Sequence, residues 1–383
     1  MTHVTDPVHT AITALRSDRV QVALGDAWVQ WLGIEAEVET SVVWTAYRPH
    51  RKGRVILDLS CTEAGGEVRH QQMMFVANPP GAEPPPLAED EFPPHVLPPV
   101  RAQPWNAIGW PVPYVPQPAG LVDLMRPETV AGLLGCPVDL IGELELIRLV
   151  PMRRSLIRTR VGQDTVFIKS YAKCSSFESG VAGLRAAATL PVSVPELLAV
   201  DGARSTFVMS GLPGVELSTL IDNQDEFDAA LYATGLALAA VHNSEMRAGG
   251  NRLDTAETDD IVRLFVADLA SIDPRLAGRI ESLAMCLARQ SQDLEPIAPR
   301  PLHGKCFGDQ ILWDSSTGLI SMVDWDDATQ GDPHFDLGRL IAHLVFLADE
   351  LELEVELGSL LDGYCQGQGE ICPARLRWHI AAA

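Results

Sequence analysis

The chain has 383 residues, enough for two or three compact units that each bury a core of their own. Hydrophobic residues make up 46% and charged residues 21%, a balance that excludes the compositions of disordered and membrane proteins. The formal net charge of −22 argues against general nucleic-acid binding, which needs clustered positive charge. The first residues lack the apolar core of a secretory signal, and no run reaches the ~20 apolar residues of a membrane span. We therefore expect a cytoplasmic protein without nucleic-acid or membrane partners.

The seven cysteines are scattered and form no Cys-x-x-Cys pair. This distribution suits a reducing compartment and argues against a disulfide framework or a structural zinc site. Cys306 is expected to be a buried, unreactive thiol.

Residues 79–120 form a proline-rich segment that holds half of the 28 prolines. Such a segment is expected to hold neither a regular helix nor a central strand. Because it also carries Phe92, Trp105, Trp110 and Tyr114, we interpret it as an extended strap packed on a surface. It separates an N-terminal domain, residues 1–78, from the rest.

The segments on either side of the strap share a pattern. Gly33 and Pro49 are sixteen residues apart, as are Gly135 and Pro151, and each glycine closes a helix-like stretch. Each proline precedes two basic residues and then a strand-like alternation. This spacing predicts an internal repeat of a helix followed by a strand hairpin.

The second copy continues into "DTVFIKSYA", a short apolar strand with Lys169 near its end. The first copy has no corresponding lysine. Around this strand, residues 148–173 hold seven basic residues against one acid, which indicates either an anionic ligand or a basic outer face of a hairpin. The next segment predicts a helix that begins with a capping box, Ser175 with Glu178.

From about residue 218 the pattern is mostly helical, with clear cases at 227–244 and 260–272. The exception is a hairpin, "QILW", "DSSTG" and "LISMV", which is followed directly by Asp324. A carboxylate at a strand end, beside the loop that opens the same hairpin, suits Mg²⁺ together with phosphate oxygens. A lysine on a separate strand can meet the phosphates as a point charge. Together these features indicate nucleotide phosphoryl transfer.

"HGKCFGDQILWD" and "MVDWDDATQGDPHFDLGRL" resemble the His-Gly-Asp-x-x-x-x-Asn loop and the metal-binding strand of the aminoglycoside phosphotransferase and choline kinase superfamily. The resemblance covers roughly residues 121–383. It implies an α+β, two-lobed protein-kinase-like fold, with a β-rich lobe at 121–212 and a helical lobe at 213–383. The N-terminal domain would then be an added α+β unit that resembles a duplicated small lobe.

The resemblance also implies roles for individual residues. Lys169 would contact the α and β phosphates of ATP, held by Glu178, for which capping is the alternative role. Backbone around Met209 and Gly211 would meet the adenine. Asp324 would bind Mg²⁺, joined by Gln310, which stands where the family usually has asparagine. His303 and Asp336 would brace the loop.

Lys305 is the severe departure, because it stands where the family has its catalytic aspartate. A protonated ammonium, with an ordinary pKa of ~10.4, cannot accept the proton of an acceptor hydroxyl. Since phosphoryl transfer depends mainly on positioning and charge neutralisation, Lys305 can instead neutralise the γ-phosphate while Asp326 or Asp327 holds the acceptor. Depression of the Lys305 pKa by burial, which would make it a base, is the other route.

Two functions follow from these residues. The first is an ATP- and Mg²⁺-dependent phosphotransferase that acts on a hydroxyl of a small molecule or peptide. The second is a pseudokinase that binds nucleotide and engages a partner protein through the N-terminal domain. Residues 349–356, "DELELEVE", place five acids along one predicted helix, either as a solvated face or as a negative wall for a cationic acceptor.

Overall fold

A computed structural model describes residues 6–48, 51–82, 92–103, 105–249, 253, 262, 263, 266 and 277–383. The chain divides into two compact units. The first comprises Met1–Leu124 with Leu149–Arg154, and the second comprises Met125–Arg148 with Ser155–Ala383. Pro49 of the predicted repeat and most of the helix expected at 260–272 lie outside the described residues.

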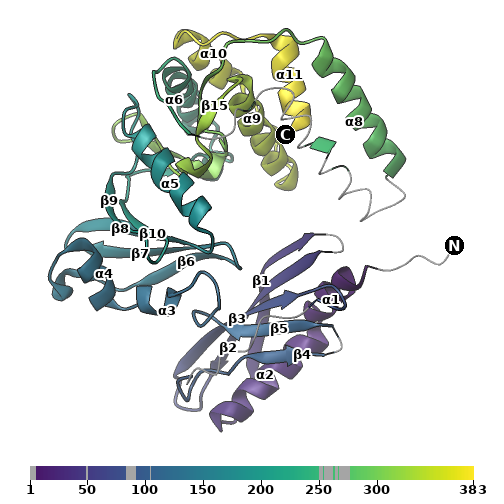
Figure 1. The fold of residues 1–383 in the computed structure, drawn as a ribbon, viewed down its shortest axis with the longest axis vertical. Coiled ribbons are helices and arrows are strands. Elements are labelled where there is room, and N and C mark those ends of the chain that lie inside the picture. Colours follow the sequence, from purple (N-terminus) through teal and green to yellow (C-terminus); the bar gives the residue numbers. More distant parts are fainter. Residues whose placement is uncertain are drawn as a thin grey trace. The chain divides into compact units, whose positions relative to one another are not determined.

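The first unit is an antiparallel sheet with two helices on one face (Figure 1). Its strands lie in the order β1-β2-β3-β5-β4. Trp28 of the second helix packs with Leu57 and Phe75 of the sheet in a common core. The elements are α1 (Pro7–Leu15), α2 (Asp18–Leu32), β1 (Val38–Arg48), β2 (Lys52–Thr62), β3 (Val68–Ala77), β4 (Val100–Ala102), β5 (Ala107–Pro111) and α3 (Leu121–Leu124).

The proline-rich segment corrects one expectation. It was expected to hold no central strand, but β5 lies between β3 and β4 and pairs with both. The reason is that its prolines flank the strand instead of interrupting it, since Pro111 is the last residue of β5. All five residues of β5 are buried. The segment therefore completes the first unit's sheet, and that unit extends to Leu124 and not to residue 78.

The second unit begins with a small lobe that repeats this organisation. Its strands lie in the order β6-β7-β8-β10-β9, the same order as in the first sheet. Gly33 after α2 and Gly135 after α4 both end their helices in the left-handed conformation, with φ of 68° and 66°. The order of elements thus agrees with the predicted repeat. The elements of the lobe are α4 (Pro127–Leu134), η1 (Val138–Leu140), β6 (Glu145–Val150), β7 (Arg154–Val161), β8 (Asp164–Tyr171), α5 (Cys174–Ala187), β9 (Leu197–Asp201) and β10 (Thr206–Ser210).

A larger helical lobe follows, with the predicted hairpin embedded in it. The hairpin strands β13 and β14 pair from Ile311 with Met322 to Asp314 with Leu319. Figure 1 shows α6, α9, α10 and α11 together in this lobe. The elements are β11 (Val215–Glu216), η2 (Leu217–Leu220), α6 (Gln224–His242), α8 (Ala277–Gln292), β12 (Arg300–Leu302), η3 (Gly308–Gln310), β13 (Ile311–Asp314), β14 (Leu319–Met322), η4 (Trp325–Asp327), β15 (Thr329–Gly331), α9 (His334–Glu350), α10 (Gly358–Gln366) and α11 (Pro373–Ala382).

The fold class predicted from the sequence is confirmed: the second unit is an α+β body with a β-rich lobe before a helical lobe. The first unit is a further α+β body. Among the described residues, no helix has both the length and the apolar character needed to cross a bilayer.

Two helix boundaries differ from expectation. The capping box at Ser175 is wrong, because α5 already begins at Cys174 and no side chain caps it. The single helix expected through 349–356 is also wrong, because α9 ends at Glu350. The backbone of Glu352 turns left-handed, with φ of 55°, and the Leu353 N–H donates to the Ala348 carbonyl at 2.8 Å. This is a Schellman motif, which ends a helix without requiring glycine.

Gly183 lets α5 approach the turn η4 closely. A Cβ atom at this position would lie 1.9 Å from the Trp325 carbonyl oxygen. We expect Gly183→Ala to lower the free energy of unfolding by about 1–3 kcal/mol through overpacking. Gly132→Ala is the matched control, since Gly132 also lies in a helix but a Cβ there meets nothing within 4 Å. The control is expected to stabilise by about 0.5–1 kcal/mol, and urea unfolding of both variants measures the difference in sign.

Candidate functional site

The predicted site residues all lie in the second unit. Lys169 is on β8, paired across the sheet with Phe207 of β10. Lys305 and Gln310 are on the loop before β13, and Asp324 follows β14 directly. Asp324 has a left-handed backbone, with φ of 66°, which is uncommon for a residue with a side chain. The hairpin therefore places Asp324 beside the loop that precedes β13, as the sequence predicted.

Asp324 is the centre of the site. Its Oδ1 accepts a hydrogen bond from the Lys169 ammonium. Its Oδ2 accepts from the Lys305 Nζ at 3.2 Å and from the Gln310 Nε2 at 3.3 Å. Two ammonium groups and one amide therefore converge on a single carboxylate whose side chain is 16% exposed.

Asp326 holds Lys169 from the other side. The Lys169 Nζ donates to its Oδ1 at 2.7 Å, and the Tyr171 hydroxyl lies 2.9 Å from each of its oxygens. The Lys169 side chain is only 7% exposed, so its charge is compensated inside the protein by two carboxylates. The sequence did not indicate Tyr171, because no local pattern links it to a residue 155 positions away.

Glu178 does not take the role that the resemblance implied. Its side chain is exposed on α5, and its Oε1 accepts from the Cys174 thiol at 3.5 Å. Among the described contacts of Lys169, Asp324 and Asp326 take the place of Glu178. The predicted pair between Lys169 and Glu178 is therefore wrong in this structure.

The loop that carries Lys305 is fixed by a buried carboxylate. Asp336 accepts from the His303 N–H at 2.7 Å and from the Gly304 N–H at 3.0 Å. Gly304 has φ of 80°, and a Cβ atom on it would lie 2.0 Å from the Asp327 carbonyl oxygen, so only glycine fits. The bracing role expected of His303 and Asp336 agrees with these contacts, since His303 Nε2 also lies 2.9 Å from the Val323 carbonyl.

Cys306 is fully buried in the same loop, and burial raises the pKa of its thiol well above the ordinary value. A thiol in that state is a poor nucleophile, in agreement with the inert role expected for it.

Met209 and Gly211 lie at the end of β10, where the adenine was expected. The Gly211 N–H donates to the Thr165 carbonyl at 2.8 Å, so that this donor is already used within the sheet. Met209 pairs with Phe167 and is half-buried. Any contact of Gly211 with a base therefore involves its carbonyl oxygen.

Metal-binding capacity depends on Asp324 and Gln310. Among the described residues, no group of three or more His, Cys, Asp or Glu side chains is arranged to hold a metal ion. However, the Gln310 Oε1 is buried and, within the described part of the chain, has no hydrogen-bond partner. An unsatisfied amide oxygen beside a carboxylate matches the ligand chemistry of Mg²⁺, which takes one or two protein oxygens and fills its remaining positions with phosphates and water. The residues present therefore fit a single hard cation.

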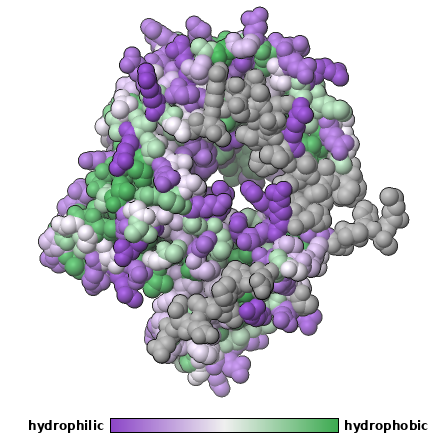
Figure 2. Space-filling model, in the orientation of Figure 1, coloured by the Kyte–Doolittle hydropathy of each residue, from purple (hydrophilic) through white to green (hydrophobic). Residues whose placement is uncertain are grey.

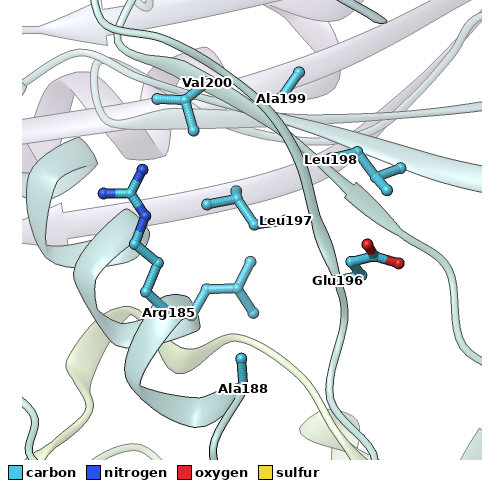
Figure 3. A pocket seen from close by; sticks show the side chains of 8 residues that line it. Arg185, Ala188, Glu196, Leu197, Leu198, Ala199 and Val200 are labelled. Atoms are coloured by element: carbon cyan, nitrogen blue, oxygen red, sulfur yellow. The ribbon is translucent and has the colours of Figure 1, made fainter.

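A pocket of about 500 Å³ lies elsewhere on the small lobe, between the end of α5 and β9 (Figure 3). Arg185 lies at one side and Glu196 at the other, with aliphatic side chains of β9 between them. Figure 2 shows apolar side chains exposed over this lobe, where Leu198 and Val200 are 40% and 42% exposed. None of the predicted site residues lines this pocket.

A model described as the phosphotransferase enzyme family (APH) matches residues 177–379, more than half of the chain. The protein belongs to the phosphotransferase enzyme family. The matched region contains the loop of Lys305, the hairpin and Asp324, and it begins just after Lys169. A search of curated protein sequences found no match.

Three solved structures are similar to this chain. A choline/ethanolamine kinase family protein from Mesorhizobium loti is 21% identical, with a TM-score of 0.48, covering 67% of this chain and 81% of that one. The aminoglycoside phosphotransferase APH(3'')-Id from Streptomyces rimosus is 16% identical, with a TM-score of 0.48, covering 68% and 96%. A putative aminoglycoside phosphotransferase from Ralstonia eutropha is 16% identical, with a TM-score of 0.45, covering 63% and 80%. The family assignment rests on the sequence match and not on these likenesses.

Proposed function

We propose that this member of the phosphotransferase family binds ATP and transfers its γ-phosphate to a hydroxyl group of a small molecule or peptide. The observation that carries the proposal is the convergence of Lys169, Lys305 and Gln310 on Asp324. Two ammonium groups at one point of a protein with a net charge of −22 form a site for a polyanion. ATP is the polyanion that the family uses.

Lys169 and Lys305 have different parts in this proposal. Lys169 is held between Asp324 and Asp326, so its position is fixed before any ligand binds. It is therefore suited to the α and β phosphates. The Lys305 side chain is 26% exposed and has one carboxylate partner among the described contacts, so it can turn to the γ-phosphate. Its ammonium would neutralise charge on the transferring group, which is the main requirement of a loose transition state.

Asp324 and Gln310 are the residues that would hold Mg²⁺. When bound, the ion would supply further neutralisation of the phosphate oxygens. Asp326 is less suited to the acceptor than the sequence indicated, because Lys169 and Tyr171 both contact it. Asp327 has an exposed side chain and lies against Gly304 through its backbone, so we assign it the acceptor hydroxyl.

The alternative function is a nucleotide-binding pseudokinase, in which the first unit engages a partner protein. The observation that favours it is the Lys305 ammonium itself, because it stands where a base is needed. The two functions separate in one experiment: ATP affinity with and without Mg²⁺, followed by ADP release in the presence of candidate hydroxyl acceptors. ADP release that requires an acceptor supports the phosphotransferase, and binding without release supports the pseudokinase.

Lys169→Met is expected to weaken ATP binding roughly tenfold or more, because charge-assisted bonds to phosphate are lost. Lys173→Met is the matched control, since Lys173 is exposed just before α5 and its loss changes the net charge equally. Calorimetric titration of both variants measures the effect, and thermal unfolding checks that each is folded. Equal affinity in the two variants would show that β8 does not contact nucleotide.

A further inference from the structure

Asp324 has both carboxylate oxygens engaged by the protein's own cationic groups. Lys169 takes Oδ1, and Lys305 takes Oδ2 together with the amide of Gln310. Oxygens of this kind are the ones that a divalent cation would take when nucleotide binds. In this protein, the ammonium groups of Lys169 and Lys305 already neutralise the negative charge of Asp324 that such a cation would neutralise.

Within the described ion pairs of Asp324 and Asp326, the charges are balanced. Lys169 and Lys305 supply two positive charges, and Asp324 and Asp326 supply two negative charges. An aspartate at position 305 would leave these four side chains with a net charge of −2, which would repel phosphates. The change from aspartate to lysine therefore contributes the same charge as one divalent cation.

We propose that Lys305 takes the place of a divalent cation at Asp324, so that this protein binds nucleoside di- and triphosphates in the absence of metal. The inference rests on the proposed nucleotide function and deepens it. Mg²⁺ binding at Asp324 and Gln310 then competes with Lys305, because the ammonium must leave Oδ2 before that oxygen can coordinate the ion.

Lys305 is the lysine that is able to play this role, and Lys169 is not. The Lys169 side chain is 7% exposed and contacts two carboxylates, whereas that of Lys305 is 26% exposed and contacts one. A long, flexible side chain with water on one side can follow a phosphate or withdraw from an incoming ion. The two lysines therefore act as a fixed and a movable cation.

The test is ADP and ATP binding by calorimetry at constant ionic strength, either with a chelator or with Mg²⁺. The wild-type protein is expected to bind both nucleotides in chelator, with less than about a threefold gain in affinity from Mg²⁺. Lys305→Gln is expected to lose roughly tenfold or more in chelator and to recover affinity with Mg²⁺. Lys305→Arg keeps the charge and is expected to keep metal-free binding.

Asp324→Asn provides an independent arm. It removes the carboxylate for which Lys305 and the metal compete, so any effect of Mg²⁺ on nucleotide affinity is expected to disappear in this variant. A gain in affinity from Mg²⁺ in Asp324→Asn as large as that in Lys305→Gln would contradict the proposal. Thermal unfolding of each variant in chelator shows whether a lost affinity reflects a lost fold.

The remaining outcomes distinguish the two proposals. Binding of wild-type protein only with Mg²⁺ would overturn the role of Lys305 and leave the proposed function intact. Equal metal-free affinity of wild type and Lys305→Gln would also overturn it. No nucleotide binding under either condition would overturn the proposed function, and the inference with it.

Discussion

Replacing Asp336 by asparagine is expected to lower the free energy of unfolding of the second unit by about 3–5 kcal/mol. Asp336 is fully buried and accepts from His303, Gly304 and the Nε2 of His242, the last at 3.2 Å. The Tyr364 hydroxyl lies 2.9 Å from His242 Nδ1, so both ring nitrogens of His242 have a partner. An asparagine amide group would face one of these donors with a donor of its own.

The loss of stability in Asp336→Asn should become smaller as the pH falls. Burial raises the pKa of Asp336, but hydrogen bonding and charge from His242 outweigh it, so the pKa lies below the ordinary value. A depressed carboxyl pKa contributes stability above the unfolded pKa of ~3.9, and this is lost as the pH falls through the folded pKa. The deficit of Asp336→Asn should therefore be full at neutral pH and shrink in strong acid.

Urea unfolding at neutral and acidic pH measures this deficit. Asp362→Asn is the matched control, because Asp362 lies exposed on α10 and should change stability by less than about 0.5 kcal/mol. Nucleotide affinity is a second readout, since the loop that carries Lys305 depends on Asp336. A variant as stable as the control would show that the loop is held by other contacts.

Local patterns predicted the parts of the site that are close together in the sequence. The hairpin, the position of Asp324 at its end and the strand of Lys169 all depend on alternation and turn residues within a few positions. The repeat could be predicted from the sequence for the same reason, since each copy has a glycine after a helix and before a strand.

Contacts between segments that are distant in the sequence could not be predicted from local patterns. Lys169 and Asp326 are 157 positions apart, and only folding shows that this aspartate, and not Glu178, compensates the lysine. The close packing of Gly183 on Trp325 likewise leaves no trace in the local sequence. The end of α9 was missed because a Schellman motif usually has glycine where this chain has Glu352.

The central strand in the proline-rich segment was missed for a different reason. The prediction used the number of prolines over the whole of residues 79–120. Within that segment, Ala107–Pro111 contains only one proline, at its end. A proline disrupts a strand only at its own position, where its missing N–H removes a hydrogen bond. The average density of prolines in a segment therefore does not decide whether a strand forms. The positions of the prolines within the segment, and not their number, allow the strand.

Arg375→Met is expected to lower the free energy of unfolding by about 3–5 kcal/mol above neutral pH. Arg375 lies on α11, and its Nη1 donates to the buried Asp332 at 2.6 Å, while its Nη2 donates to the Glu295 carbonyl. His334 and His379 are the other partners of this carboxylate, at 2.8 Å and 3.0 Å. Loss of the guanidinium leaves Asp332 with the imidazoles of His334 and His379 as its side-chain partners among the described contacts.

His379 determines how this loss varies with pH. Burial lowers the pKa of His379, hydrogen bonding and charge from Asp332 oppose this, and the charge of Arg375 lowers it further. Removing Arg375 should raise the pKa, and protonated His379 would then supply the missing positive charge. Because burial keeps the folded pKa of His379 below its ordinary value of ~6.5, this protonation occurs only in the acidic range. The deficit should therefore be full at about pH 8 and smaller at about pH 5.

Urea unfolding at these two pH values, with the histidine titration followed by NMR, tests the argument. Arg377→Met is the matched control on the same helix, because Arg377 is exposed and its loss changes the net charge equally. A deficit that is the same at both pH values would contradict the compensating role of His379. A deficit no larger than that of Arg377→Met would show that α11 is held by Leu376 and Trp378, which are also buried, and not by the charges around Asp332.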